Sequence, residues 1–528
     1  MRFDTIIMGG EVVDGTKKAA FKSDVGIKGE RILAIGDLAG AEAAEKIDAA
    51  GLIVAPGFID IHTHSDFTLL VNGAAESQVH QGVTLEVIGQ CGFSLAPVDD
   101  ADSANVLVPA QFQKIEITWK SFGEYLARLE RQDLGVNVIA MVGQGTIRRT
   151  VMQDALRPAT PTETDRMVRL LEESLAEGAG GFSTGLEYWP GKSSTCEEIL
   201  PLCEVAARRN VLYSTHVRNR DNYYDVSFAE ALALARNSGV KLQISHIQPK
   251  FGAPPNAMAH TLDMIEWAGE AGADVAFDVI PSVWAHTGLT AALPSWALEG
   301  GTEKLIKRLQ NPEEREKMKY NPMPHWLLVP ARKWDRIALL RSSHHKDLIG
   351  MTFEEIGQAR GVDPYDAYFD LLLEAGDDLH SLMWTSRNFS EDDVRLCLKQ
   401  PECGVISDTF ALAPHGALKG MIGSLNGYGW VARLFEHYVR QEGLLSLEEA
   451  VHKITSLPAS RLGLNDRGIL RPGAQADITI FNINTISDNS SITAPCVYPS
   501  GIEHVLVNGK FTIKSADRMD VNPGRVIR

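Results

Sequence analysis

The sequence has few cysteines and no long uncharged hydrophobic run, which excludes two broad classes of protein. Six cysteines in 528 residues are too few for the disulfide framework of a secreted scaffold. No apolar stretch reaches transmembrane length free of charge, so we expect no membrane partner. The first residues, Met1-Arg2-Phe3-Asp4-Thr5, lack the basic segment and apolar core of a secretory signal peptide. These absences predict a soluble, cytoplasmic protein.

The chain also lacks an excess of positive charge. Its 68 acidic and 51 basic residues leave a net charge of −17 at pH 7, with histidine counted as neutral. Such a surface repels phosphate groups, which argues against nucleic acid or an anionic membrane as partner. The apolar content of 44% and the charged content of 23% are ordinary for a globular protein. We therefore expect a small-molecule substrate, and the sequence leaves homo-oligomerisation open.

Most of the chain alternates strand-like apolar runs with helix-length amphipathic segments, which is typical of a parallel α/β fold. Eight such runs are rich in Val, Ile, Leu, Ala or Phe, as strands buried on both faces should be. They lie at 57–64, 84–89, 137–143, 180–185, 211–216, 241–246, 274–280 and 404–408, and 381–385 is an alternative to one of them. Eight strands predict a closed (β/α)8 TIM-like barrel.

The two ends of the chain have a different pattern, with short strands separated by turn residues. We expect 1–55 and 465–528 to form one small β-sandwich domain, and 56–464 to form the barrel. Within the barrel, 283–400 is much longer than a barrel loop requires. This long insertion near the catalytic face could be a lid, a substrate-binding subdomain or an oligomerisation surface, and the sequence does not choose between them.

Potential metal ligands stand at the ends of several apolar runs. His62 and His64 end the first run, Cys91 lies just beyond the second, and His216, His246 and Asp408 end the fifth, sixth and eighth. Side chains at i and i+2 of a strand share a face, so the two histidines of His62-Thr63-His64 can bind one cation together. The carboxyl ends of barrel strands converge on one pocket, which would bring all six residues together.

This set of ligands favours zinc. Imidazole and thiolate ligands with one carboxylate suit zinc better than magnesium or calcium. Each residue alone has a common structural explanation, such as a buried thiol or a satisfied core histidine. Six matching strand ends make that explanation poor for the group, and they suit either one metal or two. His286 and His415 are weaker candidates, because each follows a strand that ends at the same pocket.

The chain resembles the amidohydrolase superfamily and, within it, the D-aminoacylase (N-acyl-D-amino-acid deacylase) group. The resemblance covers nearly the whole chain, and the motifs that carry it are 55–66, 81–84, 90–97, 181–191, 215–218, 244–246 and 407–408. The stretch Cys91-Gly92-Phe93-Ser94-Leu95-Ala96-Pro97 is the most specific of them. Hydantoinases and dihydroorotases use a carboxylated lysine on the fourth strand, but 180–185 contains no lysine. The resemblance therefore implies that Cys91 takes the bridging position.

The resemblance also implies roles for individual residues. Cys91, His216 and His246 would bind the tighter zinc, while His62, His64 and Asp408 would share Cys91 with a weaker or optional second metal. Asp408 would act as general base and then as general acid. Tyr188, in the motif Ser183-Thr184-Gly185-Leu186-Glu187-Tyr188, would hold or polarise the scissile carbonyl.

The chain departs from the group's pattern where the substrate would bind. The usual Ser-His-His-Lys becomes Ser245-His246-Ile247-Gln248-Pro249-Lys250, and the usual Asp-x-Tyr-Pro-Tyr loses both tyrosines at 278–282. The segment 413–417 lacks the arginine that can take the substrate carboxylate. The remaining candidates for substrate contact are Lys250, Arg218, His415 and Trp284, with Arg433 as another source of positive charge.

These observations predict a zinc-dependent hydrolase of a linear C–N amide bond that uses metal-activated water, with Asp408 as general base and acid. The altered substrate elements leave other substrates open: another amide, a carbamate, a cyclic amide, or an ester such as an aromatic xenobiotic. A remote alternative is an inactive scaffold with the amidohydrolase fold, which the complete set of six ligands disfavours.

Overall fold

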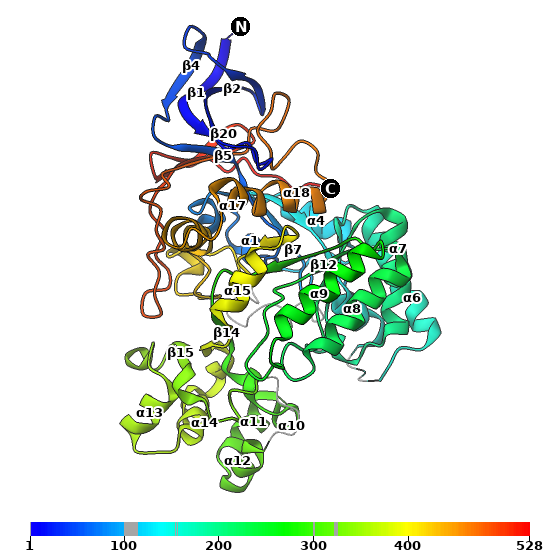
Figure 1. The fold of residues 1–528 in the computed structure, drawn as a ribbon. Helices are drawn as coiled ribbons and strands as arrows, with labels where there is room; N and C mark the ends of the chain where they lie inside the picture. Colours follow the sequence, from blue (N-terminus) through cyan, green and yellow to red (C-terminus); the bar gives the residue numbers. More distant parts are fainter. Residues whose placement is uncertain (1, 100–114, 154, 156, 299–300, 321–325) are drawn as a thin grey trace.

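The computed structural model describes the chain except residues 1, 100–114, 154, 156, 299–300 and 321–325. At its centre lie eight parallel barrel strands (Figure 1). They are β6 (Phe58–Asp60), β7 (Val83–Ile88), β8 (Asn137–Ala140) with β9 (Val142–Gly143), β10 (Gly181–Gly185), β11 (Leu212–His216), β12 (Lys241–Ile244), β13 (Val275–Val279) and β17 (Cys403–Val405). The first and eighth strands meet just beyond their ends, where Thr63 and Thr409 form a parallel bridge. All eight predicted runs are therefore barrel strands.

Helices surround the barrel, and several have the sequence signals that start a helix. The barrel helices include α4 (Phe122–Glu130), α5 (Gln144–Met152), α6 (Pro161–Ala176), α7 (Cys196–Arg209), α8 (Tyr224–Ser238), α9 (Ala257–Glu270), α15 (Glu391–Leu398) and α17 (Leu447–Lys453). Shorter helices are α1 (Thr68–Val71), α2 (Glu76–Val79), α16 (Trp430–Arg433), the π-helix η8 (Leu434–Gln441) and α18 (Ser456–Arg461). In α6, the Thr160 side chain accepts from the Glu163 backbone and Glu163 binds back, which forms a capping box.

The two ends of the chain form one sheet, which lies above the barrel in Figure 1. Its nine strands are β1 (Arg2–Val12), β2 (Phe21–Lys28), β3 (Arg31–Gly36), β4 (Glu42–Asp48), β5 (Ile53–Pro56), β18 (Ile478–Phe481), β19 (Ile502–Val507), β20 (Lys510–Lys514) and β21 (Asp517–Arg518). The antiparallel pair β5–β18 joins the N-terminal and C-terminal strands. The sheet packs a hydrophobic cluster of its own, which includes Ile27, Val54 and Ile478.

The insertion forms a separate small α/β unit on the opposite side of the barrel from the terminal sheet (Figure 1). It contains the antiparallel strands β14 (Trp284–Gly288), β16 (Met383–Arg387) and β15 (Ile337–Arg341), and the helices α10 (Ser295–Leu298), α11 (Gly301–Leu309), α12 (Pro312–Lys319), α13 (Phe353–Arg360) and α14 (Pro364–Ala375). Its core is distinct from that of the barrel and is built around Trp334, Phe353, Tyr368 and Trp384. Segment 381–385 therefore belongs to the insertion, and not to the barrel.

Short 3-10 helices connect several of these elements: η2 (Gly191–Ser193), η3 (Leu289–Ala292), η4 (Trp334–Arg336), η5 (Lys346–Leu348), η6 (Gly376–Ser381) and η7 (Gly416–Leu418). The last part of the predicted insertion, helix α15, returns to the barrel and packs against α9 and β17. Among the described residues, no helix has both the length and the apolar character needed to cross a membrane.

Candidate metal centre

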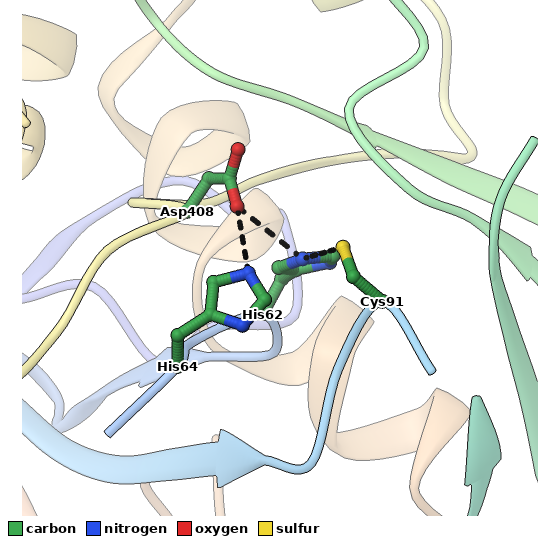
Figure 2. Close-up of side chains that lie close together, drawn as sticks. All are labelled: His62, His64, Cys91 and Asp408. Atoms are coloured by element: carbon green, nitrogen blue, oxygen red, sulfur yellow. Dashed lines mark hydrogen bonds and ion pairs between the residues drawn. The ribbon is translucent and has the colours of Figure 1, made fainter. Parts of the chain in front are cut away.

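The carboxyl end of the barrel holds His62 and His64 just after β6, where the first and eighth strands meet. The Asp408 backbone N–H donates to the His62 carbonyl at 3.2 Å, and the His64 N–H donates to the Thr409 carbonyl at 2.8 Å. This pairing keeps the segment extended beyond the three residues of β6, so the two histidines point to the same side (Figure 2). The Thr63 hydroxyl between them lies 3.3 Å from a Glu86 carboxylate oxygen on the other side.

Six side chains converge there in two groups that share Cys91. The first group is His62, His64, Cys91 and Asp408, shown in Figure 2. In it, Asp408 Oδ1 lies 3.2 Å from His64 Nε2 and 3.4 Å from His62 Nε2, and His62 Nε2 lies 3.4 Å from Cys91 Sγ. Within each group the candidate ligand atoms lie within 4.8 Å of one another.

The second group is Cys91, His216 and His246, and all three residues are buried. Cys91 Sγ lies 3.6 Å from His216 Nδ1 and 3.5 Å from His246 Nε2, and the two imidazole nitrogens are 2.9 Å apart. Ligand atoms around a tetrahedral zinc ion lie about 3.3–3.6 Å apart, given Zn–N and Zn–S bonds of about 2.0 and 2.3 Å. The two distances from Cys91 Sγ lie within that range, and the distance between the two imidazole nitrogens is shorter.

Backbone conformation at three of these residues is unusual for side chains with a Cβ atom. Cys91, His246 and Asp408 have φ angles of 53°, 34° and 51°, in the left-handed region. Such residues cost about 1–3 kcal/mol each and occur mostly at functional sites. Each follows the carboxyl end of a barrel strand, so the turn that ends the strand also directs the side chain into the pocket.

The protonation chemistry of the second group fits a cation. Burial lowers the pKa of His216 to about 4 and that of His246 well below its usual value, so both imidazoles are neutral and have a lone pair to offer. Burial also raises the pKa of the Cys91 thiol, which then requires a nearby cation to become a thiolate. Neutral imidazoles, a thiolate and a carboxylate are the donors that zinc accepts.

Comparison with protein-family models matches residues 45–244 and 398–513 to the amidohydrolase family. The chain belongs to this family. N-acyl-D-glutamate deacylase of Alcaligenes xylosoxydans xylosoxydans is 34% identical to this amidohydrolase, over 100% of its chain and 97% of the relative. The prediction from sequence that the chain is an enzyme of the amidohydrolase family is therefore confirmed.

Solved structures give the same result for the fold. N-acyl-D-glutamate deacylase from Bordetella bronchiseptica, in complex with zinc and a phosphonate mimic of the tetrahedral intermediate, matches this amidohydrolase with a TM-score of 0.82 and 30% identity over 100% of both chains. A structure of D-aminoacylase matches with a TM-score of 0.80, 30% identity and the same coverage. That enzyme has a binuclear metal centre with one-metal activation and second-metal attenuation. The predicted fold class is confirmed, and metal dependence is supported.

Tyr188, which was predicted to hold or polarise the scissile carbonyl, lies beside the centre. Its ring centroid is 4.5 Å from that of His216, and 39% of the residue is exposed. Lys250 also lies close, but it is buried and its Nζ donates to Glu187, which in turn lies 2.8 Å from His216 Nε2. The sequence pattern indicated no function for Glu187, although this residue lies within the motif 181–191.

The other predicted substrate-contact residues each have a polar or aromatic partner outside the metal centre. Arg218 donates twice to Glu230 and also to the carbonyls of Lys192 and Ser194. His415, with 67% of its side chain exposed, lies 3.1 Å from Glu76 Oε1. Trp284 is on β14 of the insertion, with the Arg387 guanidinium 5.8 Å from its ring centroid. These three side chains therefore have partners other than the six candidate ligands.

Two further residues of this amidohydrolase lie beside the centre. Arg220 is buried, donates to the His246 carbonyl at 2.6 Å, and has an Nε with no hydrogen-bond partner among the described residues. His286, on β14 of the insertion, interacts with the Asp408 backbone, and burial lowers its pKa to about 4. The sequence signalled His286 through its position after a barrel strand, whereas nothing in the pattern distinguished Arg220 from other arginines.

Proposed function

We propose that this amidohydrolase is a zinc-dependent deacylase that hydrolyses a linear amide bond in an N-acyl compound. The observation that carries the proposal is the convergence of four histidines, one cysteine and one aspartate at the carboxyl end of the barrel. Relatives that match the whole chain and are named N-acyl-D-glutamate deacylase support the choice of an amide.

We assign the ligands to two positions. Cys91, His216 and His246 are all buried and would hold the tighter zinc. His62, His64 and Asp408 would hold a weaker second metal with Cys91 shared, because His64 and Asp408 are partly open to solvent. A bound zinc ion supplies a Lewis acid that polarises a carbonyl and acidifies a water molecule.

The protein's own groups then move the proton. The Asp408 carboxylate accepts a proton from the attacking water and returns it to the amine nitrogen as the C–N bond breaks. Burial opposes ionisation of Asp408, but the hydrogen bond with His64 holds its pKa well below the usual value, so the carboxylate is ionised and can accept a proton. The Tyr188 hydroxyl, on the partly exposed side of His216, would donate a hydrogen bond to the carbonyl oxygen as negative charge develops there.

The charges around the site favour a second candidate, an amide or carbamate without a free carboxylate. Lys250, Arg218 and Arg433 are the cations that the sequence nominates for a substrate carboxylate. Lys250 binds Glu187, Arg218 binds Glu230, and Arg433 lies 3.4 Å from Glu391 and donates to the Pro281 carbonyl. If the substrate does carry a carboxylate, Arg220 is the buried cation beside His246 that would receive it.

A hydrolysis screen of the zinc-loaded protein tests both candidates. The panel pairs N-acetyl-D- and L-amino acids with their carboxamide counterparts, and includes anilides and phenyl carbamates. Release of the amine from N-acetyl-D-amino acids supports the first candidate, and release only from carboxylate-free compounds supports the second. If no member of the panel is hydrolysed with zinc, cobalt or manganese bound, the proposed amide hydrolysis is wrong.

We also propose a cytoplasmic location and no nucleic-acid partner. All six cysteines are unpaired, which is typical of a reducing compartment, and the net charge is −17. Cell fractionation checks the location. Light scattering on the purified protein decides whether it forms a homo-oligomer.

A further inference from the structure

We propose that Glu187 and Lys250 are positioning residues, which together set the tautomer of His216 so that its Nδ1 faces the metal. This inference rests on the proposed metal site, and it deepens it, because it removes Lys250 from the substrate-binding residues. It concerns which ring nitrogen carries the proton, a property that His216 alone does not determine.

The first step is the geometry on the two sides of the His216 ring. Nδ1 lies 3.6 Å from Cys91 Sγ and 2.9 Å from His246 Nε2, on the side of the candidate ligands. Nε2, on the other side, lies 2.8 Å from Glu187 Oε2. A carboxylate only accepts hydrogen bonds, so Nε2 must carry the proton and Nδ1 must present its lone pair. Carboxylates that orient metal-binding histidines in this way raise the basicity of the ligand.

The second step is the position of Lys250, whose side chain is only 2% exposed. Its Nζ donates to Glu187 Oε1, the oxygen that does not face His216, and lies 3.8 Å from Asp221 Oδ2. An ammonium group only donates hydrogen bonds. Lys250 therefore compensates the buried carboxylate and also prevents it from rotating away from its present orientation. The Trp326 ring of the insertion covers the ammonium at 4.9 Å from the ring centroid.

The third step is a comparison with the other buried histidines of the centre. The outer ring nitrogens of His62 and His246, both Nδ1, have no hydrogen-bond partner among the described residues. Of these three fully buried imidazoles, His216 is thus the one with a carboxylate on its outer nitrogen. We infer that His216 is the ligand whose orientation is fixed before a metal binds, and that the Glu187–Lys250 pair sets the affinity of the tighter position.

The pair makes an unusual prediction for Glu187→Gln. Lys250 still requires an acceptor, so the glutamine oxygen turns to Lys250 and its amide NH2 faces His216 Nε2. That NH2 can only donate, which favours the tautomer with a proton on Nδ1, directed at the metal position. We expect zinc affinity to fall about 10–100-fold, the usual cost of losing such a partner. In Glu187→Gln/Lys250→Met the amide can rotate its oxygen to His216, and zinc affinity should partly recover relative to the single variant.

The experiment measures zinc affinity of the full-length apo protein by competition with a chromophoric chelator, so no substrate is involved. Visible absorption of the cobalt-loaded protein reports the ligand geometry, and thermal unfolding of each apo protein checks its fold. Glu198→Gln is the matched control, because Glu198 is another buried carboxylate, and its partners are Arg148, Gln144, Ser194 and the Ala159 backbone N–H, none of which is a candidate ligand. We expect zinc affinity of this control to match that of the wild type.

Two results would overturn the inference: unchanged zinc affinity in a folded Glu187→Gln protein, or a double variant that binds zinc no better than Glu187→Gln alone. If Glu187→Gln does not fold, Lys250→Met is measured instead, and weaker zinc binding supports the inference. If Lys250→Met binds zinc normally but raises KM only for carboxylate-bearing substrates, Lys250 is a substrate ligand and the inference is wrong. Because zinc binding is read without turnover, failure of the proposed hydrolysis would be recognised separately in the substrate screen.

Discussion

Replacing Asp408 by asparagine should separate proton transfer from metal binding. The change keeps the size of the side chain, and asparagine tolerates the left-handed backbone at φ 51°. The backbone bond from residue 408 to the His62 carbonyl stays, because the N–H is unchanged. What is lost is an oxygen that can accept a proton, at the position 3.2 Å from His64 Nε2 and 3.4 Å from His62 Nε2.

The expected loss in turnover is about 10²–10⁴-fold, which corresponds to about 2.7–5.4 kcal/mol in the barrier. Zinc at Cys91, His216 and His246 should remain at one equivalent, because Asp408 does not belong to that group. The assay is initial rate on the best substrate of the screen, with metal content measured on the same sample. Asp24→Asn is the matched control, since Asp24 is a buried aspartate of the terminal sheet that accepts from Gly9 N and Leu38 N. Full activity in a zinc-loaded Asp408→Asn protein would refute the assignment of Asp408 as the base.

Three further predictions concern the metal, the substrate and the packing around Cys91. Removing the metal with a chelator should abolish hydrolysis and lower the melting temperature, since zinc at 1,000 times its Kd stabilises the fold by about 4 kcal/mol. Calorimetry of the apo and the reloaded protein measures the two melting temperatures, and equal values would contradict the prediction. Arg220→Met should raise KM for carboxylate-bearing substrates and leave KM for carboxylate-free substrates unaffected. Steady-state kinetics on pairs of substrates with and without the carboxylate measure this difference, and equal effects on both would exclude Arg220 from substrate recognition. Gly185→Ala places a Cβ 2.0 Å from the Cys91 carbonyl oxygen and should destabilise the protein by about 1–3 kcal/mol. Gly269→Ala is the control, because its Cβ would have no neighbouring atom within 4 Å and stability should not fall. Urea unfolding compares the two variants, and equal stability would contradict the close approach at Gly185.

The barrel and the convergence of the six residues could be predicted because both depend on patterns along single strands. The barrel strands are almost entirely buried on both faces, so apolar residues predominate in them and they appear in the sequence as near-continuous apolar runs. A closed barrel then brings the carboxyl ends of all strands together, whatever the loops do. The insertion was harder to interpret: its strand β16 has the same apolar pattern as a barrel strand. Only its antiparallel pairing with β14 and β15 distinguishes it.

The partners of the charged side chains could not be predicted, because they depend on neighbours from different strands. The pairing of β10 with β11 places Gly185 opposite His216. Glu187 lies two positions beyond the end of β10, so its side chain reaches the outer side of the His216 imidazole. Lys250 reaches the same carboxylate from the loop after β12. Sequence alone presents Lys250, Arg218 and Arg433 as equivalent unpaired cations, whereas the fold gives each a carboxylate.

These pairings change what the altered motifs mean for the substrate. A lysine that moves from its usual position in a substrate site could simply bind the same carboxylate from a new place. Lys250 does not have that freedom here, because moving its ammonium to a substrate would leave Glu187 uncompensated in a buried site next to His216. Carboxylate recognition by Lys250 would therefore weaken the metal position that the reaction needs. A substrate that presents no carboxylate to Lys250, or one that presents it to Arg220, avoids this conflict, and the paired substrates of the screen distinguish these two cases.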